Sequence, residues 1–579
     1  MSSKSVINAA SKNADYDLTI FNVKIANVYT KELLNGYICI KNGFISHVDF
    51  DSSSELPASS RYYDGKGKIA APGFIDTHMH IESSMMNPVN FANVALPHGT
   101  TTAVCDPHEI ANVAGIKGIE YMIENSKSTP MDLLYVAPSC VPSAVGVETA
   151  GASFGGKEIK EILEMDGVIG IAELMDYPGV VSGDSRMMEI VEEAHKKNVF
   201  IQGHAPLLSG SRLSAYISSG ARSDHEVRTY EEAMEKLRLG VVLECRESSG
   251  AKNIPELAKA VIQCGFPPNA TLCTDDRDAG DLLVEGHLDQ VARSAVLNGI
   301  PPIETLKMIT LNAASWLRLH DRGAISPGLR ADIVLIDDFE KFNVDEVFVL
   351  GNLVAKGGKM ISPATSFDLE FEKTNSMRLD KLDKSNFAFD LPDGNYKMKI
   401  MSIDPDVTYL TTLETIDVDV LDGYVDINDT DLVYLAVFER HNIDKTSSLC
   451  LLRNSGISHG AVASTISHDC HNLVVIGKSI DDMVISANTL IECGGGVAVS
   501  ADKRILSVIE LPIGGIMASK SAEELIPEIN HTKTTIKSLG FRGAPIMQIA
   551  TLSLAVLPYV RLTNLGLVDV SKQKVIPLV

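Results

Sequence analysis

The sequence predicts an α/β protein whose centre is a TIM-like (β/α)8 barrel, with a small β-sandwich beside it and a C-terminal α+β domain after it. Three observations predict this fold. Between residue 73 and about residue 320, short apolar strands alternate with amphipathic helices through eight units, the number that closes such a barrel. Polar residues gather where these strands end. The segments on either side of the barrel show strand and hairpin patterns instead.

The chain has 579 residues, more than one domain usually holds, so we expect several. Strand patterns precede the barrel, with a hairpin turn at Asn42-Gly43, and similar patterns follow it. Because both segments flank the barrel, we expect them to pair with each other. The expected domains are the β-sandwich (residues 1–72 with 321–365), the catalytic barrel (73–320) and the C-terminal α+β domain (366–579).

The barrel strands can be read off in chain order as apolar runs that end in polar residues. Amphipathic helices separate them, for example SRMMEIVEEAHKKN after the fourth strand. The active site of such a barrel lies at the carboxyl ends of its strands. The expected strands are GFIDTHMH, TTAVCD, LLYVAPSC, VIGIAELM, VFIQGHAP, ARSDHE, VVLECRE and ATLCTDD.

Composition excludes several classes of protein. The formal net charge of −24 argues against a sequence-independent nucleic-acid binder, which needs a basic surface. The N-terminus lacks the apolar core of a signal peptide, and no apolar run is long enough to span a membrane. The nine cysteines form no C-x-x-C pair, as expected for reduced thiols. We therefore expect a cytoplasmic enzyme, a homodimer or homotetramer, with no nucleic-acid or membrane partner.

The first barrel strand ends in a pair of histidines, His78 and His80. Side chains two residues apart on a strand point to the same face. Such a pair can offer two imidazoles to one metal ion. Taken alone, the pair could equally be a surface feature, so the case depends on what the other strand ends supply.

Four later strand ends add one candidate metal ligand each. Each of them could be structural if seen alone, as a helix cap or a buried histidine. Together with the first pair they amount to four histidines and two carboxylates, enough for two divalent ions. A set without thiolates suits Mn²⁺, which we expect first, with Fe²⁺ and Zn²⁺ as alternatives. The added ligands are Glu173, placed to bridge the ions, His204, His225 and Asp275.

Three further assignments leave a choice open. Asp275 is preferred to Asp276 at the eighth strand because it ends the apolar run. Asp106 and His108, in CDPHE, end the second strand, where they could orient ligands, hold an additional metal or simply form a turn. The C-terminal region holds a dense polar cluster, for which turn or interface chemistry is expected ahead of a second metal site. That cluster consists of His468, Asp469, His471 and Asn472.

This order of ligands resembles the amidohydrolase superfamily, whose barrels are metal-dependent hydrolases. Several segments are also similar to the bacterial adenine deaminases, and the similarity runs from about residue 17 to the C-terminus. Ser248 stands where that family is expected to have glycine. The resemblance implies hydrolysis of adenine to hypoxanthine and ammonia, in purine salvage, at a binuclear centre. The segments are GTTTAVCDPHEIANVAG, LECRESSGAKN, LCTDDRDAGDLLVEGHLDQ, SHDCHNLVVIG and ELPIGGIMA.

The chemistry assigns roles to three residues. Water held between two divalent ions becomes hydroxide near neutral pH and can add to C6 of adenine. Glu247, at the end of the seventh strand, is expected to protonate the adjacent ring nitrogen. Asp275 would take the proton from the water and pass it to the leaving amine, and Arg246 would orient Glu247 or the substrate. The alternative for Arg246 and Glu247 is a surface ion pair.

Three other functions are alternatives to this one. An amidohydrolase acting on a cyclic amide or on a different aminopurine is the nearest, although cyclic-amide hydrolases usually bridge their metals with a carboxylated lysine, not a residue such as Glu173. The zinc deaminases that act on nucleotides combine H-x-E with P-C-x-x-C. His80-Ile81-Glu82 matches the first motif, but the second is absent from the sequence. A catalytically silent scaffold would purify without stoichiometric metal.

Overall fold

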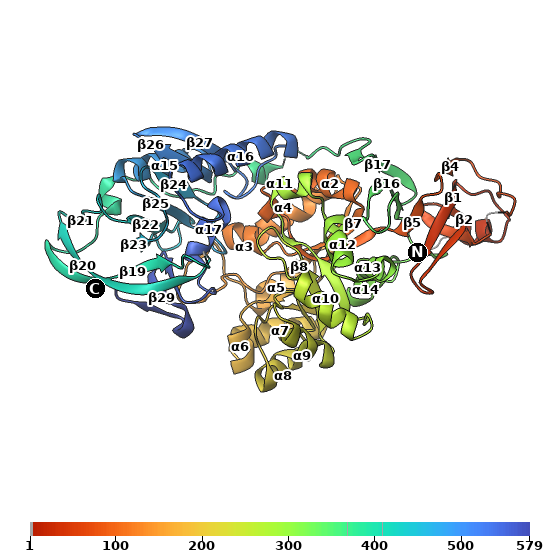
Figure 1. The fold of residues 1–579 in the computed structure, drawn as a ribbon, viewed down its shortest axis with the longest axis horizontal. Coiled ribbons are helices and arrows are strands. Elements are labelled where there is room, and N and C mark those ends of the chain that lie inside the picture. Colours follow the sequence, from red (N-terminus) through yellow and green to blue (C-terminus); the bar gives the residue numbers. More distant parts are fainter. Residues whose placement is uncertain (1–3, 52, 368, 408) are drawn as a thin grey trace.

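The computed structural model describes residues 4–51, 53–367, 369–407 and 409–579. These residues form an elongated molecule with the barrel in the middle (Figure 1). The N-terminal strands lie at one end of the long axis and the C-terminal domain lies at the other. The barrel therefore contacts a different β structure on each side.

The barrel predicted from the alternating pattern is confirmed. Its parallel strands form one sheet in the order β10-β9-β8-β7-β6-β14 and a second in the order β11-β12-β13. A bridge between Ile201 and Ala221 joins the sheets on one side, and β14 pairs with β6 on the other. The strands are β6 (Phe74–His80), β7 (Thr100–Cys105), β8 (Asp132–Ala137), β9 (Val168–Leu174), β10 (Phe200–Gly203), β11 (Ser223–Asp224), β12 (Val242–Arg246), β13 (Ala270–Cys273) and β14 (Asp275–Asp276).

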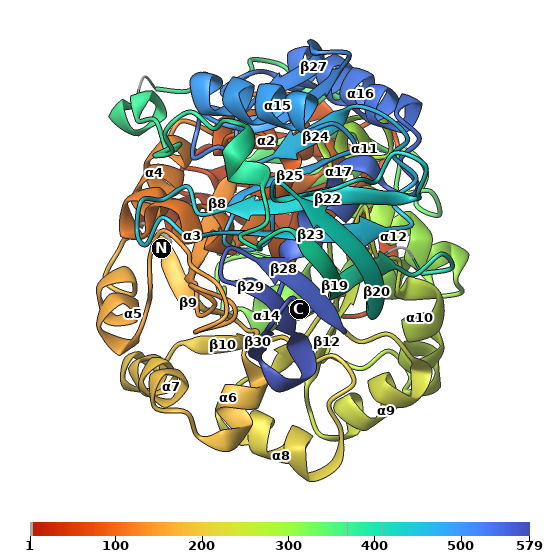
Figure 2. The same ribbon diagram turned by 90° about the vertical axis from the view of Figure 1, so that its left-hand side faces the viewer.

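Helices surround these strands (Figure 2), and α7 (Ser185–Lys197) shows why they form. Asp184 caps it by accepting a hydrogen bond from the Met187 N–H, and the helix ends at Asn198 in the left-handed region. Its buried residues recur at helical spacing. The other helices around the barrel include α2 (Pro88–Ala95), α4 (Ile116–Ser126), α5 (Gly156–Ile162), α8 (Gly210–Ser218), α9 (Tyr230–Arg238), α10 (Ile254–Gln263) and α12 (Leu288–Leu297).

The strands before and after the barrel share one sheet. In it, β5 (Ile69–Pro72) pairs with β1 (Leu18–Asn27) on one side and with β15 (Ile333–Ile336) on the other. Because β5 leads through Gly73 directly into β6, this sheet supports the first barrel strand. The remaining strands are β2 (Glu32–Lys41), β3 (Phe44–Asp49), β4 (Tyr62–Asp64), β16 (Val344–Val349), β17 (Asn352–Lys356) and β18 (Lys359–Met360).

The C-terminal region contains a nine-stranded mixed sheet in the order β21-β20-β19-β23-β22-β25-β24-β26-β27. The helix α16 (Ala522–Ser538) packs in this domain and is capped by Ser521. Other elements are α15 (Ile480–Cys493), α17 (Pro545–Ala550), β19 (Gly394–Ile403), β20 (Thr411–Leu421), β21 (Tyr424–Val425), β22 (Leu432–Phe438), β23 (Ser447–Arg453), β24 (Ala461–Ser464), β25 (Leu473–Gly477), β26 (Gly496–Ala501), β27 (Arg504–Glu510) and a small sheet of β28 (Val560–Thr563), β29 (Gly566–Asp569) and β30 (Lys574–Ile576).

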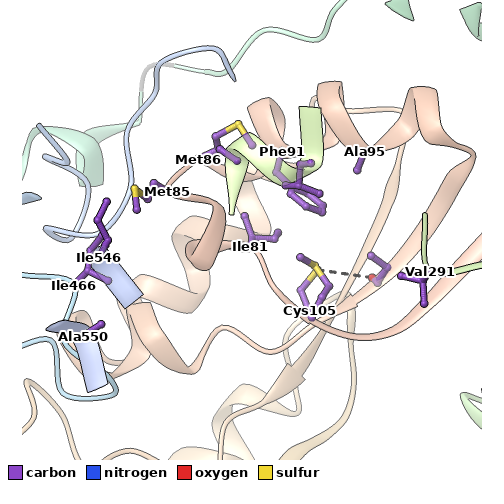
Figure 3. Packing of buried hydrophobic residues seen from close by; sticks show 14 of the residues in the cluster. Ile81, Met85, Met86, Phe91, Ala95, Cys105, Val291, Ile466, Ile546 and Ala550 are labelled. Carbon is purple, nitrogen blue, oxygen red and sulfur yellow. Dashed lines mark hydrogen bonds between the residues drawn. The ribbon is translucent and has the colours of Figure 1, made fainter. Parts of the chain in front are cut away.

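The C-terminal domain is docked on the chain just after β6. The Ala518 N–H donates to the Met85 carbonyl at 2.9 Å, and the Asn87 N–H donates to the Ala518 carbonyl at 3.2 Å. Around this contact one buried apolar cluster continues from the barrel into the C-terminal domain. Figure 3 shows Met85 next to Ile466 and Ile546 in that cluster. Burial of this shared core stabilises the docked arrangement.

Two sequence expectations can be compared with the described residues. None of their helices is both long enough and apolar enough to cross a bilayer. All nine cysteines are unpaired.

One buried lysine ties two barrel strand ends together. Lys236, on α9, donates to the Asp224 carboxylate at 2.5 Å, to the Glu232 carboxylate at 2.6 Å and to the Ala205 carbonyl at 2.7 Å. Its side chain is 1% exposed. Asp224 and Ala205 are the immediate neighbours of His225 and His204, so this lysine holds the backbone on which both histidines stand.

We expect Lys236→Met to lower the free energy of unfolding by about 3–5 kcal/mol, because it leaves two buried carboxylates without their cation. The measurement is the urea midpoint of the metal-stripped protein. Lys259→Met is the matched control, since Lys259 makes an exposed ion pair with Glu256 on α10 and should leave the midpoint almost unchanged. Equal midpoints for the two variants would contradict the prediction.

Candidate metal centre

The structure brings the six predicted strand-end ligands together at the barrel mouth. The two β6 histidines are buried, with side chains 0% and 3% exposed. Three groups of side chains could each hold a metal ion, because within each group the candidate ligand atoms lie within 4.8 Å of one another. These overlapping groups are His80, Asp106, His108 and Glu173; His78, His225 and Asp275; and Glu173, His204 and His225.

Glu173, at the end of β9, has imidazoles on both of its oxygens. Its Oε1 lies 3.6 Å from His80 Nε2 and 3.6 Å from His108 Nδ1. Its Oε2 lies 3.3 Å from His225 Nε2 and also contacts His204 Nδ1. A carboxylate in this position can reach two ions at once, one through each oxygen.

The two carboxylate oxygens of Asp275 contact different groups. Its Oδ1 lies 3.2 Å from His80 Nε2 and 3.6 Å from His78 Nε2. Its Oδ2 accepts a hydrogen bond from Arg246 at 2.6 Å. Asp276 reaches the same region, since it forms a ligand group with His80 and Asp275, but only Asp275 joins His78 and His80 to Arg246 among the contacts of the described residues.

Gln202 decides which nitrogen of His78 is free. Its amide Nε2 donates to the Thr77 carbonyl at 2.6 Å, so its Oε1 is the acceptor for His78 Nδ1 at 3.1 Å. His78 therefore carries its proton on Nδ1, and its buried Nε2, which has no hydrogen-bond partner, offers a lone pair to the centre. Gln202 is not among the residues predicted from the sequence. It stands two residues before His204, and this spacing could have indicated it.

His80 is oriented in the same way by the end of β7. Its Nδ1 donates to the Asp106 carbonyl at 3.0 Å, which directs Nε2 toward the centre. The Asp106 carboxylate contacts His108 Nδ1 at 3.0 Å, and the rings of His80 and His108 lie 4.6 Å apart. The structure thus places Asp106 and His108 beside the centre, in contact with its ligands.

The charges of the centre are strongly coupled. Burial would raise the pKa of Glu173, but His204 and His225 hold that pKa well below its ordinary range. Burial and the neighbouring His108 favour neutral His80, yet the carboxylates of Asp275 and Asp276 raise its pKa well above its ordinary value. Carboxylates and imidazoles that share one buried volume in this way suit a divalent cation.

Arg246 connects the centre to a further carboxylate, Glu226. One guanidinium nitrogen contacts both Glu226 and Asp275. Burial opposes ionisation of Glu226, but Arg246, together with His204 and His225, lowers its pKa to about 2. Glu226 follows His225 directly in the chain. Glu226 is not among the residues predicted from the sequence, because only the fold brings Arg246 to it.

Glu247 is the predicted residue that the structure does not bring to the centre. β12 ends at Arg246, and Glu247 is the residue that follows it. The Glu247 carboxylate accepts a hydrogen bond from Ser294 of α12 at 2.8 Å, between the barrel wall and its helices. Arg246 lines the cavity described next and Glu247 does not. Its expected role as proton donor stays a prediction, and in this structure its carboxylate lies against α12.

A cavity of about 450 Å³ opens above the ligands. Its floor contains His80, Glu173 and Asp275, and the C-terminal domain contributes part of its wall. A polar floor under a partly apolar wall is typical of a small-molecule site. The C-terminal residues are His468, Asp469, Met547, Thr551, Leu554, Val556, Leu557 and Pro558.

Comparison with known proteins gives matches to two family models. The model described as "Amidohydrolase family" matches residues 69–354, and the model described as "Adenine deaminase C-terminal domain" matches residues 408–574. Among solved structures, a beta-aspartyl dipeptidase from Fervidobacterium islandicum is 17% identical, with a TM-score of 0.45, over 60% of this chain and 98% of its own.

Curated relatives match the chain along its whole length. A protein named adenine deaminase from Thermosipho melanesiensis is 37% identical over 100% of this chain and 99% of its own length. One named adenine deaminase 2 from Carboxydothermus hydrogenoformans is 38% identical over 99% of each chain. One named adenine deaminase from Clostridium botulinum is 36% identical over 100% of this chain and 97% of its own.

We expect Gln202→Leu to weaken the binding of divalent metal by about 10–100-fold, because His78 would lose the partner that orients it. Equilibrium dialysis of the metal-stripped protein against Mn²⁺ measures this. Gln263→Leu, at the exposed end of α10, is the control and should bind as the unmodified protein does. Unchanged affinity in Gln202→Leu would remove Gln202 from the centre.

Proposed function

The chain belongs to the adenine deaminase family of the amidohydrolase superfamily, and from this premise we propose that it hydrolyses free adenine to hypoxanthine and ammonia at the centre around Glu173. It is a metal-dependent hydrolase, as the family match over its full length implies. The observation that carries the proposal is the Glu173 carboxylate, with imidazoles on both oxygens at the floor of the 450 Å³ cavity.

The proposed centre is binuclear. On one side the ligands would be His78, His80 and Asp275 with Glu173 Oε1, and on the other His204 and His225 with Glu173 Oε2. Two divalent ions bound there would lower the pKa of a shared water and so supply a nucleophile near neutral pH. The donor set has no thiolate, which supports Mn²⁺ as the first choice, with Fe²⁺ and Zn²⁺ as alternatives.

Asp275 is the residue we propose for proton transfer. Burial would raise its pKa, but Arg246 and the histidines of β6 hold that pKa well below its ordinary range, so it stays a carboxylate that can accept a proton. It would take the proton from the water and donate it to the departing amine. Arg246 would fix Asp275 by the 2.6 Å hydrogen bond, and Glu226 would hold Arg246 from the other side.

The rival functions fit the centre less well. Glu173, and not a lysine, stands at the bridging position, which counts against a hydrolase of cyclic amides. A silent scaffold would have to bury these carboxylates and imidazoles without using them, and burying ionisable groups is costly. The second candidate that keeps the same centre is an amidohydrolase acting on a different aminopurine.

Further proposals concern the chain as a whole. We propose that it works in purine salvage in the cytosol, as a homodimer or homotetramer, without nucleic-acid or membrane partners. The net charge of −24 supports the absence of nucleic-acid binding. The proposed domains are residues 1–72 with 321–365, residues 73–320, and residues 366–579, and the sheet shared by β5 and β15 supports the first of them.

The direct test is ammonia release from free adenine by the Mn²⁺-loaded protein and by the metal-stripped protein side by side. We expect release only from the loaded protein, because the nucleophile depends on the metal. Hypoxanthine, identified by its absorption spectrum, should form in equal amount. No release from protein that has been shown to hold two ions would move the substrate to other aminopurines or cyclic amides.

Paired variants test which residue transfers protons. We expect Asp275→Asn to lower kcat by about two to four orders of magnitude, and Glu247→Gln to keep most of its turnover because its carboxylate lies outside the cavity. The metal content of both variants is measured alongside, since Asp275 is also a proposed ligand. A loss in Glu247→Gln as large as that in Asp275→Asn, with metal retained, would restore Glu247 as the proton donor.

A further inference from the structure

A second, much smaller cavity lies between the barrel and the C-terminal domain. It measures about 10 Å³, close to the space that one water or one bare ion occupies. Its polar lining consists of Glu82, Ser83, Glu109, His468 and His471. The apolar residues beside it include Met85 and Ile466, which Figure 3 shows near each other in the shared core.

Three of these polar residues already form a ligand set. Glu109 stands on α3 (His108–Ala114) of the barrel, whereas His468 and His471 lie between β24 and β25 of the C-terminal domain. His468 Nδ1 is 2.6 Å from Glu109 Oε1, and His471 Nε2 contacts Glu109 Oε2. Their ligand atoms all lie within 4.8 Å of one another, and the three residues are buried.

Two buried atoms near this cavity have no hydrogen-bond partner. They are Oε2 of Glu82 and Nε2 of His468, on side chains that both line the cavity. Buried polar atoms without a partner are uncommon in folded proteins, and a bound ion is one of the standard reasons for them. Two carboxylates, Glu82 and Glu109, also share this buried space, and a cation would offset their repulsion.

We propose that Glu109, His468 and His471 hold a further divalent metal ion, apart from the centre around Glu173, with Glu82 facing the same cavity. Two imidazoles and a carboxylate are the donor set of many zinc sites, so Zn²⁺ is the ion to test. Because one ligand comes from the barrel and two come from the C-terminal domain, the ion cross-links the two domains.

His108 places this site next to the main centre. Its Nδ1 lies 3.0 Å from the Asp106 carboxylate and 3.6 Å from Glu173 Oε1. Its Nε2 lies 3.4 Å from Glu109 Oε1. A single imidazole therefore contacts both sets of ligands, and the position of the C-terminal domain is coupled to the floor of the large cavity through it.

The experiment counts bound ions. The full-length protein is stripped of metal, loaded with Zn²⁺ and freed of excess, and zinc per chain is measured for the unmodified protein, His471→Gln and Glu109→Gln. We expect each variant to bind one ion fewer than the unmodified protein. The control is His441→Gln, because His441 is buried in the same interface and contacts the Cys470 carbonyl but lies outside the small cavity. It should bind as many ions as the unmodified protein.

The comparison between variants separates this site from the binuclear centre. Whatever the total count, the loss of one ion in both cluster variants supports the further site, and Glu173→Ala reports on the main centre instead. Equal counts in the unmodified protein and both variants would overturn the proposal and leave Glu109 paired with its histidines without an ion. If one variant fails to fold, the other changes the opposite side of the interface and decides the result.

A second measurement concerns domain docking. Zn²⁺ should raise the melting temperature of the stripped, unmodified protein more than that of Glu109→Gln, because a ligand stabilises the state that binds it. His441→Gln should gain as much as the unmodified protein. An equal gain in Glu109→Gln would show that the ions bind elsewhere.

Discussion

The side chains of the candidate metal centre are arranged by one constraint, the free-energy cost of burying charged groups at the carboxyl end of the barrel. Carboxylates and imidazoles can share a buried volume only if each has a partner of opposite charge or a hydrogen bond. Glu173 is stable as a carboxylate because imidazoles face both of its oxygens, and Asp275 is stable because Arg246 and two histidines face it. The predicted ligand set is therefore held in place by contacts within the protein.

The surrounding residues serve this arrangement. Gln202 sets the tautomer of His78, and the Asp106 carbonyl orients His80. Lys236 fixes the backbone beside His204 and His225 from beneath. Farther out, the sheet that contains β5 continues into β6 and supports the strand that carries the two leading histidines. Each of these contacts restricts the position of the side chains or backbone nearer the centre, and a preorganised site requires such restriction.

The C-terminal domain is part of the same construction. It forms part of the wall of the large cavity, and its Ala518 forms backbone hydrogen bonds with the loop that follows His80. The polar cluster around His468, for which turn or interface chemistry was expected, lies at this contact and reaches Glu109 of the barrel. Closing the cavity therefore requires both domains, although the predicted ligands of the main centre all belong to the barrel.

The sequence by itself determined the barrel and the strand ends that carry His78, His80, Glu173, His204, His225 and Asp275. Period-two strands alternating with helices predict strand order, and the carboxyl ends of the strands in a barrel must meet. Only the tertiary structure decided that the Glu247 carboxylate contacts Ser294 of α12, because this contact depends on how the helix packs beside the strand end. It also decided the contacts between Arg246 and Glu226, between His78 and Gln202, and between Glu109 and the two C-terminal histidines. The two partners in each of these contacts are far apart in the chain, so no local sequence pattern predicts them. They meet only because packing brings their helices, strands and loops together.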